Sequence, residues 1–248
     1  CPLVLADPAR AARLEGHDHP ARVLVFDHGD PETGLALLLG EETPLSPVSG
    51  DDLATILYTS GSTGAAKGAF SDHRGVIHGA LSYAAQSLMV LTWFAKFGTP
   101  PAGQPSALIN VPLFHVTGEV PVLLQSFVIG RKLVIMSKWD AAEAMRLIES
   151  ERITYFVGVP LMSWEIAQHP ERARFDLSSC QTWASGGAPR PVDHVAGIRE
   201  ALPAGYPIIG YGLTETNAVG CGNFHDNFPA KPGSTGPASR PLCEVAIL

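Results

Sequence analysis

The sequence is poor in cysteine, and the cysteines it has are scattered. Four occur among 248 residues, at Cys1, Cys180, Cys221 and Cys243, and no two of them form a C-x-x-C motif. This spacing argues against a zinc ribbon, a thiol redox motif or a disulfide-stapled scaffold. We therefore expect a reducing compartment and, because no secretory signal is seen at the start of the chain, predict a cytoplasmic location.

Long hydrophobic runs and an excess of positive charge are also lacking. Hydrophobic residues make up 46% of the chain, yet no uninterrupted apolar run reaches the roughly 18 residues of a membrane span, so none is predicted. The richest stretch, residues 84–97, predicts a buried helix. The net charge of −7 argues against a nucleic-acid-binding protein, which carries a basic surface. One nucleotide needs only a local positive site and is not excluded.

Strand-like and helix-like segments alternate along the chain. The predicted strands are residues 23–27, 53–59, 106–111, 132–136, 154–159, 182–184 and 208–211. The predicted helices are residues 9–14, 72–95, 116–127, 141–151, 161–167 and 192–202. Asp140 and Glu143 are placed to form a capping box at the start of the fourth helix. The alternation predicts the α/β fold class, with a largely parallel sheet flanked by helices.

Residues 41–52 are rich in proline, serine, glycine and acidic side chains, and predict a surface linker. This linker would divide the chain into a partial leading segment, residues 1–50, and a core, residues 51–248.

The strongest functional signal is a loop rich in glycine and hydroxyl side chains. It follows the predicted strand 53–59 and reads T-S-G-S-T-G-A-A-K-G from Thr59 to Gly68. Glycines let backbone N–H groups approach a phosphate, hydroxyls add donors, and Lys67 adds a positive charge. An ordinary surface turn of this composition is the alternative. The Walker pattern G-x-x-x-x-G-K-[ST] is not met, because Lys67 is preceded by Ala66 and followed by Gly68.

Three further segments carry side chains suited to a nucleotide and an acid. They read A-S-G-G-A-P at residues 184–189, Y-G-L-T-E-T at 211–216 and P-L-F-H-V-T-G at 112–118. An aromatic face suits a purine, a threonine hydroxyl can donate to phosphate, and a carboxylate suits Mg²⁺, which prefers hard oxygen ligands. Each segment taken alone is also compatible with an ordinary turn, and a single histidine is more often structural than catalytic.

Together these segments resemble the adenylate-forming enzymes, a family of acyl- and aryl-CoA synthetases, firefly-type luciferases and peptide-synthetase adenylation domains. The phosphate loop of that family reads [YF]-T-S-G-S-T-G-x-P-K-G, and residues 58–68 match every fixed place except Ala66, where proline is usual. K-P-G-S-T-G-P at residues 231–237 resembles the family's G-S-x-G-x-P segment. The motifs occur in the family's order and spacing, and the likeness is specific from residue 51 onward.

The resemblance implies a set of nucleotide-binding residues. The loop would hold the β- and γ-phosphates of ATP through Thr59, Ser60, Gly61, Ser62, Thr63, Gly64 and Lys67. The second segment would lie along the adenine and the acyl pocket through Gly186, Gly187, Ala188 and Pro189. Tyr211 would stack on the adenine next to Gly212, Thr214 would bond the α-phosphate, and Glu215 would hold Mg²⁺. His115 would donate to the substrate carboxylate, so the implied catalytic residues are Lys67, His115, Thr214 and Glu215.

The function implied by the resemblance is ATP-dependent activation of a carboxylic acid to acyl-AMP, followed by thioester formation with coenzyme A. ATP, Mg²⁺ and coenzyme A, the last as co-substrate, are the expected cofactors. A small-molecule carboxylic acid is the expected partner, and a homodimer is compatible with the family. Amino-acid-activating relatives read F-D-x-S where this chain has residues 114–117, and the missing Asp argues against an amino acid. The apolar segment 114–124 instead suits a fatty or aryl acid.

Alternatives remain at this point. They are a luciferase-like enzyme, a peptide-synthetase adenylation domain and a non-catalytic nucleotide-binding remnant. The family's ribose-binding Asp, hinge and C-terminal domain with its catalytic Lys are not found in the sequence. We therefore predict that residues 51–248 are part of the N-terminal domain, that the C-terminal domain is absent, and that the chain alone cannot complete efficient adenylation.

Overall fold

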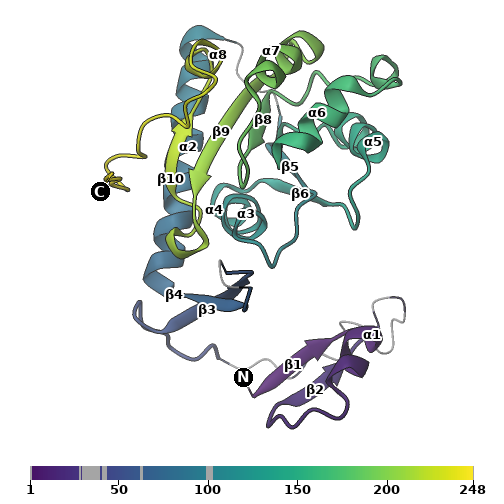
Figure 1. The fold of residues 1–248 in the computed structure, drawn as a ribbon, viewed down its shortest axis with the longest axis vertical. Coiled ribbons are helices and arrows are strands. Elements are labelled where there is room, and N and C mark those ends of the chain that lie inside the picture. The colour runs from purple at the N-terminus through teal and green to yellow at the C-terminus, as the bar shows by residue number, and fades with distance from the viewer. Residues whose placement is uncertain are drawn as a thin grey trace. The chain divides into compact units, whose positions relative to one another are not determined.

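The structure is a computed structural model, and it describes residues 2–27, 29, 40, 44–61, 64–98 and 103–247. The chain divides into two compact units, Cys1–Val48 and Ser49–Leu248. In the first unit, strands β1 (Leu3–Ala6) and β2 (Arg22–Val25) pair in parallel. Helix α1 (Pro8–Ala11) and the 3₁₀ turn Ala12–Leu14 lie between these two strands in the sequence (Figure 1).

A six-stranded sheet organises the second unit. In chain order its strands are β5 (Ser106–Ile109), β6 (Lys132–Ile135), β7 (Tyr155–Gly158), β8 (Thr182–Ser185), β9 (Tyr206–Gly212) and β10 (Gly220–Asn223). Their order in the sheet is β10-β9-β8-β7-β5-β6, and every neighbouring pair is parallel except β9 and β10. The predicted α/β fold with a largely parallel sheet is confirmed. Parallel strands end at one common edge of the sheet, and that edge carries the site described below.

Each face of the sheet is covered by its own helices. One face packs against α5 (Ala141–Glu151), α6 (Pro160–Gln168) and α7 (Val192–Ala201), where Leu108, Phe156 and Trp183 join a buried cluster. The other face carries Ala107, Val157 and Ala184, which pack with Val122. Successive residues of a strand point to opposite faces, so the strands supply both clusters.

The second face is covered by a segment of mixed helical type and by helix α2. The segment consists of α3 (Val116–Gly118), a π-helical turn (Glu119–Leu124) and α4 (Gln125–Ile129), with Pro121 inside the π turn. Proline has no N–H for an α-helical hydrogen bond, which accounts for the irregularity within the helix predicted over 116–127.

Helix α2 (His73–Phe97) confirms the long helix predicted at 72–95. The Asp72 carboxylate begins it by accepting from the Gly75 N–H at 2.6 Å, as an N-cap does. The expectation that residues 84–97 are buried was wrong for one face of the helix. Phe94 is buried, but Leu88 and Met89 are exposed, because only the face toward the sheet is covered.

The N-terminus of α5 confirms half of the predicted capping box. The Asp140 carboxylate accepts from the Glu143 N–H at 2.8 Å. The Glu143 carboxylate, however, pairs with Arg146, with Oε1 2.6 Å from Nη2, instead of returning to the Asp140 N–H. A charged partner one turn along the helix competes successfully for that carboxylate.

A two-stranded hairpin precedes α2. Strands β3 (Leu53–Thr59) and β4 (Lys67–Asp72) pair antiparallel, with Thr59 opposite Lys67. The predicted loop 60–68 is therefore shorter than expected, because Lys67 and Gly68 belong to β4. Its residues Ser62 and Thr63 lie outside the described residues.

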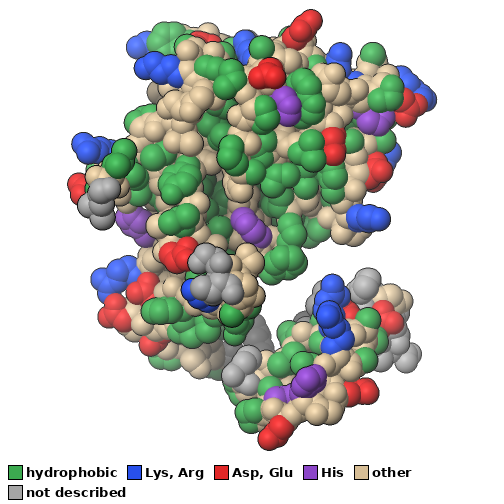
Figure 2. Space-filling model, viewed as in Figure 1, with side chains coloured by type: hydrophobic (Ala, Val, Ile, Leu, Met, Phe, Trp, Pro, Cys, Tyr) green, Lys and Arg blue, Asp and Glu red, His purple; other side chains and the backbone are tan. Residues whose placement is uncertain are grey.

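The remaining short elements are the 3₁₀ turns Arg172–Arg174 and Thr214–Thr216 and helix α8 (Asn227–Ala230). Within the described ranges, none of the helices combines the length and apolar character that a membrane span requires. On the face shown in Figure 2, acidic and basic side chains are interspersed rather than gathered by sign.

Candidate functional site

Two hollows meet where the carboxyl edge of the sheet approaches the β3–β4 hairpin. One is a cavity of about 490 Å³. The other is an open hollow against the hairpin, lined by Thr59, Gly61, Lys67, Gly68, Ala69, Phe70 and Glu215. Thr59 and Glu215 line both hollows, so the two are continuous at these residues.

The open hollow brings together a lysine and a carboxylate that the sequence analysis had selected independently. Lys67 lies at the start of β4 and Glu215 in the turn after β9, and both side chains are exposed. Neither forms an ion pair with any residue that the structure describes. A free ammonium and a free carboxylate beside one hollow can serve a polyphosphate and its metal ion.

Gly61 is required by the shape of the loop between β3 and β4. Its φ is +62°, and a Cβ placed there would lie 2.6 Å from the carbonyl oxygen of Ala65. Only glycine fits this backbone without strain. Two other predicted loop residues, Ser60 and Gly64, are exposed and do not line either hollow.

The 3₁₀ turn Thr214–Thr216 presents its first two side chains to the site. The hydroxyl of Thr216 donates to the Val219 carbonyl at 2.6 Å and accepts from the Leu213 N–H at 3.1 Å, which fixes the turn. Among the described residues, no hydrogen bond engages the side chains of Thr214 and Glu215, and both line the cavity. Thr216 is thus structural, while Thr214 and Glu215 are available to a ligand.

His115 also lines the cavity and is exposed. Its Nδ1 accepts from the Thr117 N–H at 3.1 Å, so the imidazole caps helix α3. A neutral ring that accepts at Nδ1 carries its proton on Nε2. The local geometry therefore leaves Nε2–H as the donor that His115 can offer to a substrate oxygen.

The predicted adenine-binding residues divide into two groups. Gly186, Gly187 and Gly212 line the cavity. Ala188, Pro189 and Tyr211 are exposed and line neither hollow, and no ring contact involving Tyr211 is found among the described residues. The structure therefore brings the glycines together with His115 and Thr214, but leaves the Tyr211 ring at the surface beside them.

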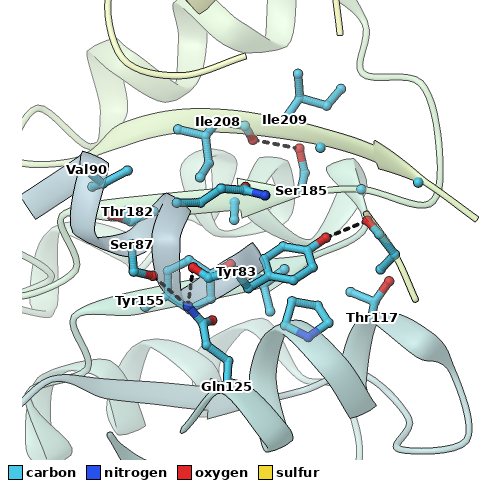
Figure 3. Close-up of a pocket in the computed structure, with 18 of the residues that line it drawn as sticks. Tyr83, Ser87, Val90, Thr117, Gln125, Tyr155, Thr182, Ser185, Ile208 and Ile209 are labelled. Atoms are coloured by element: carbon cyan, nitrogen blue, oxygen red, sulfur yellow. Dashed lines mark hydrogen bonds between the residues drawn. The ribbon is translucent and has the colours of Figure 1, made fainter. Parts of the chain in front are cut away.

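The cavity extends across the sheet from its carboxyl edge to its amino edge. Gly186 and Thr214 line the carboxyl end. Thr182, which begins β8, and Thr154, which directly precedes β7, line the amino end. Figure 3 shows Thr117 at one end, Val90, Thr182 and Tyr155 toward the other, and Tyr83 between them. Its middle is apolar, with Val157, Ala184 and Ile208 supplied by the sheet.

The apolar lining follows the sequence-based expectation only in part. Segment 114–124 supplies Val116 and Pro121 to the lining, whereas Phe114 is exposed and Val120 and Val122 are buried. The strands and helix α2 supply most of the wall instead, through residues that the sequence analysis missed. Helix α2 contributes residues at helical spacing, and all of them line the cavity: Tyr83, Gln86, Ser87 and Val90. This stripe, partly polar on an otherwise apolar helix, was the available signal.

Hydrogen bonds hold the wall from α2 in place. The Tyr83 hydroxyl donates to the Ala218 carbonyl at 2.6 Å, and burial raises the pKa of Tyr83 well above its ordinary range. The Gln125 amide donates to the Tyr83 carbonyl at 2.8 Å and to the Ser87 hydroxyl at 2.6 Å (Figure 3). The lining is therefore largely formed in advance of any ligand.

Comparisons with known proteins give a family match. The family model described as AMP-binding enzyme matches residues 3–248. The chain is 34% identical over 213 residues to a feruloyl-CoA synthase of an Amycolatopsis species, covering 80% of this chain and 40% of the relative. It is 33% identical over 188 residues to a long-chain-fatty-acid–CoA ligase of Bacillus subtilis (strain 168), covering 75% of this chain and 31% of the relative.

A solved structure shares the fold. The N-terminal domain of FACL13 from Mycobacterium tuberculosis, solved with an inhibitor bound, matches with a TM-score of 0.77 and 27% identity. That match covers 95% of this chain and 56% of the other. The chain thus spans less than half the length of the two curated relatives it matches.

Proposed function

The chain belongs to the AMP-binding enzyme family, and on that premise we propose that it activates a carboxylic acid with ATP for transfer to coenzyme A. Residues 51–248 would form the core that binds the nucleotide and the acid, as part of a longer catalytic arrangement. The observation that carries this proposal is the meeting of Lys67 and Glu215 in one hollow, continuous with the cavity that holds His115 and Thr214.

The donor set fits magnesium shared with phosphate. Among the described residues, no group of three or more His, Cys, Asp or Glu side chains could hold a metal by itself. Mg²⁺ commonly uses one or two carboxylates together with substrate phosphates, and the unpaired Glu215 carboxylate can supply one such ligand. When bound there, the ion would neutralise phosphate charge.

The proposed roles of the residues are those that the family resemblance implies, and the geometry of the site supports them. In the first step a carboxylate oxygen of the acid attacks the α-phosphorus of ATP, the bond to the bridging oxygen breaks, and pyrophosphate leaves. Lys67 and the loop N–H groups would neutralise the leaving pyrophosphate, and the Thr214 hydroxyl would donate to the α-phosphate. His115 Nε2–H would hold the attacking carboxylate. Positioning and charge neutralisation would supply most of the rate enhancement.

In the second step the thiol of coenzyme A attacks the acyl carbon, AMP leaves and the thioester remains. A fatty or an aryl acid suits the apolar middle of the cavity, and the two curated relatives described above are named for one acid of each class. A non-catalytic remnant is disfavoured because Lys67 and Glu215 are both present and converge. A cytoplasmic location and a homodimer remain predictions.

Binding of acyl-adenylate mimics tests the proposal. We would titrate the chain calorimetrically with acyl-sulfamoyl adenosines that carry a dodecanoyl or a benzoyl group, and with AMP. We expect saturable binding that is tighter for at least one acylated compound than for AMP. Failure of all three ligands to bind would contradict the proposal.

The phosphate hollow is tested by Lys67→Ala. We expect about a tenfold weaker affinity for ATP, the usual cost of a lost charge-assisted hydrogen bond, with the affinity for AMP unchanged. Lys138→Ala, at another exposed lysine outside both hollows, is the matched control. Equal loss of ATP and AMP binding would argue against Lys67 as the ligand of the outer phosphates.

A further inference from the structure

A buried arginine lines the end of the cavity farthest from the proposed nucleotide site. Arg131 lies directly before β6 and is only 7% exposed. It takes part in none of the ion pairs formed by the described residues. Burying a cation without an anionic partner is costly, so such a group calls for a reason.

The hydrogen bonds of Arg131 are all to neutral oxygens. Its Nε donates to the Ser126 hydroxyl at 2.8 Å, and its Nη2 donates to the Pro121 and Val122 carbonyls, both at 3.0 Å. These carbonyls belong to the π-helical turn, so part of the role of Arg131 is to hold that turn. None of these contacts neutralises the positive charge.

One nitrogen of Arg131, with its two N–H groups, is left over. Its Nη1 makes no hydrogen bond to any described residue and is not among the buried polar atoms that lack a partner, so it retains accessible surface. The guanidinium lies 4.8 Å from the ring centroid of Tyr155, whose hydroxyl is likewise accessible and without a partner among the described residues. Both residues line the cavity. Two donor groups are therefore available at its far end.

The far end is well separated from the proposed reaction centre. Along β8 the lining residues run from Thr182 to Gly186, which at about 3.3 Å per residue corresponds to about 13 Å. Between these ends the sheet supplies the apolar side chains of Val157, Ala184 and Ile208, and the Ser185 hydroxyl, which donates to the Ile208 carbonyl. An acyl group whose carboxyl lies beside His115 would therefore cross apolar wall before it meets Arg131.

We propose that Arg131, assisted by the Tyr155 hydroxyl, recognises an oxygen acceptor at the end of the acyl group opposite the carboxylate that is activated. This inference rests on the proposed function and names the class of acid: one that ends in a second carboxylate, or in a carbonyl or hydroxyl oxygen. A methyl terminus at the same place would cover Nη1 without giving it a partner. Burial lowers the pKa of Arg131, as expected for a cation that lacks an anion.

The test compares acyl-sulfamoyl adenosines that differ only at the far end. The series holds dodecanoyl, ω-hydroxydodecanoyl and ω-carboxy-undecanoyl groups, together with shorter homologues of each, titrated calorimetrically into the chain. We expect at least one oxygen-terminated compound to bind about tenfold more tightly than the methyl-terminated compound of equal length. Preference for the carboxylate or for the hydroxyl then tells an anionic from a neutral ligand.

Two variants assign the preference to Arg131. Arg131→Met should bring the ratio of affinities for the oxygen-terminated and methyl-terminated compounds close to one. Arg131→Lys keeps the positive charge but loses the planar guanidinium, and should retain a part of the preference. The matched control is Arg199→Met. Arg199 also lies over a tyrosine ring, 4.3 Å from the Tyr206 centroid, and bonds the Gly205 carbonyl, but it lies outside the cavity. Arg199→Met should leave the ratio of these two affinities unchanged.

The outcomes separate the two proposals. If no adenosine analogue of any kind binds, the proposed function itself is contradicted. If the analogues bind but methyl-terminated compounds are equal or preferred at every length, only the assignment of Arg131 is overturned. The wild-type comparison needs no substitution, so a variant that fails to fold does not remove the test.

Discussion

The Ser71 hydroxyl donates a hydrogen bond to Asn217 Oδ1 at 3.1 Å. Ser71 lies on β4, the strand that begins with Lys67, and Asn217 directly follows the turn that carries Glu215. Asn217 is buried and adopts a left-handed conformation with φ of 52°, one that Asn tolerates better than most residues. This contact links the two segments that line the open hollow beside the β3–β4 hairpin.

Removing that link should loosen the open hollow, where we propose that the phosphates of ATP bind. Ser71→Ala leaves a buried amide oxygen unpaired, and we expect the free energy of unfolding to fall by about 1–2 kcal/mol. ATP should bind more weakly, with AMP less affected. Urea denaturation and calorimetric titration measure the two effects. Thr92→Ala, which removes a hydroxyl bonded only to the Leu88 carbonyl of its own helix, is the control. Equal behaviour of the two variants would show that the link has no such role.

The two roles of His115 can be separated by substitution. His115→Ala removes both the helix cap and the proposed donor, whereas His115→Asn keeps an oxygen suited to capping. We expect His115→Ala to lower the free energy of unfolding by about 1 kcal/mol and His115→Asn to change it little. Both variants should bind the acyl-sulfamoyl adenosines more weakly while binding AMP as before. Undiminished binding in both would remove His115 from the acid site.

Two glycines in the proposed nucleotide motifs should respond differently to alanine. A Cβ on Gly212 would lie 2.1 Å from the Ala218 carbonyl oxygen, so Gly212→Ala should destabilise the protein by about 3 kcal/mol through overpacking. Gly187 has φ of +74° and open space around it. Gly187→Ala should therefore cost only the backbone strain, about 1 kcal/mol. Thermal and urea unfolding of both variants give the comparison, and a reversed order would contradict it.

His225 should make stability depend on pH. The ring is 7% exposed, stacks on Trp93 at a centroid distance of 4.0 Å, and has no hydrogen-bond partner on either nitrogen among the described residues. Burial lowers its pKa from the ordinary 6.5. The unfolded chain therefore binds the proton more readily than the folded chain, and stability present above about pH 6.5 is lost as the pH falls toward the folded-state pKa.

His225→Phe removes that titration. Between about pH 7.5 and about pH 5.5, the free energy of unfolding of the wild type should fall more than that of the variant. Urea denaturation across this range measures both slopes. Identical slopes for wild type and His225→Phe would show that His225 does not titrate in this way.

Most of the strands and helices could be predicted because their signals are local. Asp140 and the buried face formed by Ala144, Met145 and Ile148 define α5 from its own residues. The errors arose where a competing partner decides, either one turn along a helix or on a paired strand. Glu143 bonds Arg146 instead of completing a capping box, and Lys67 is drawn into β4 by pairing with Thr59. The exposed face of α2 likewise depends on what the rest of the fold covers.

The sequence by itself determined the alternation of elements, the family and the residues to examine, because hydrophobic periodicity and short motifs are properties of neighbouring positions. The tertiary structure alone decided which of these residues meet. It placed Lys67 beside Glu215 through the β3–β4 hairpin and the turn after β9, and left Tyr211 outside both hollows. It also revealed Arg131 in the cavity wall, because burial and an unused donor are properties of packing that no local pattern records.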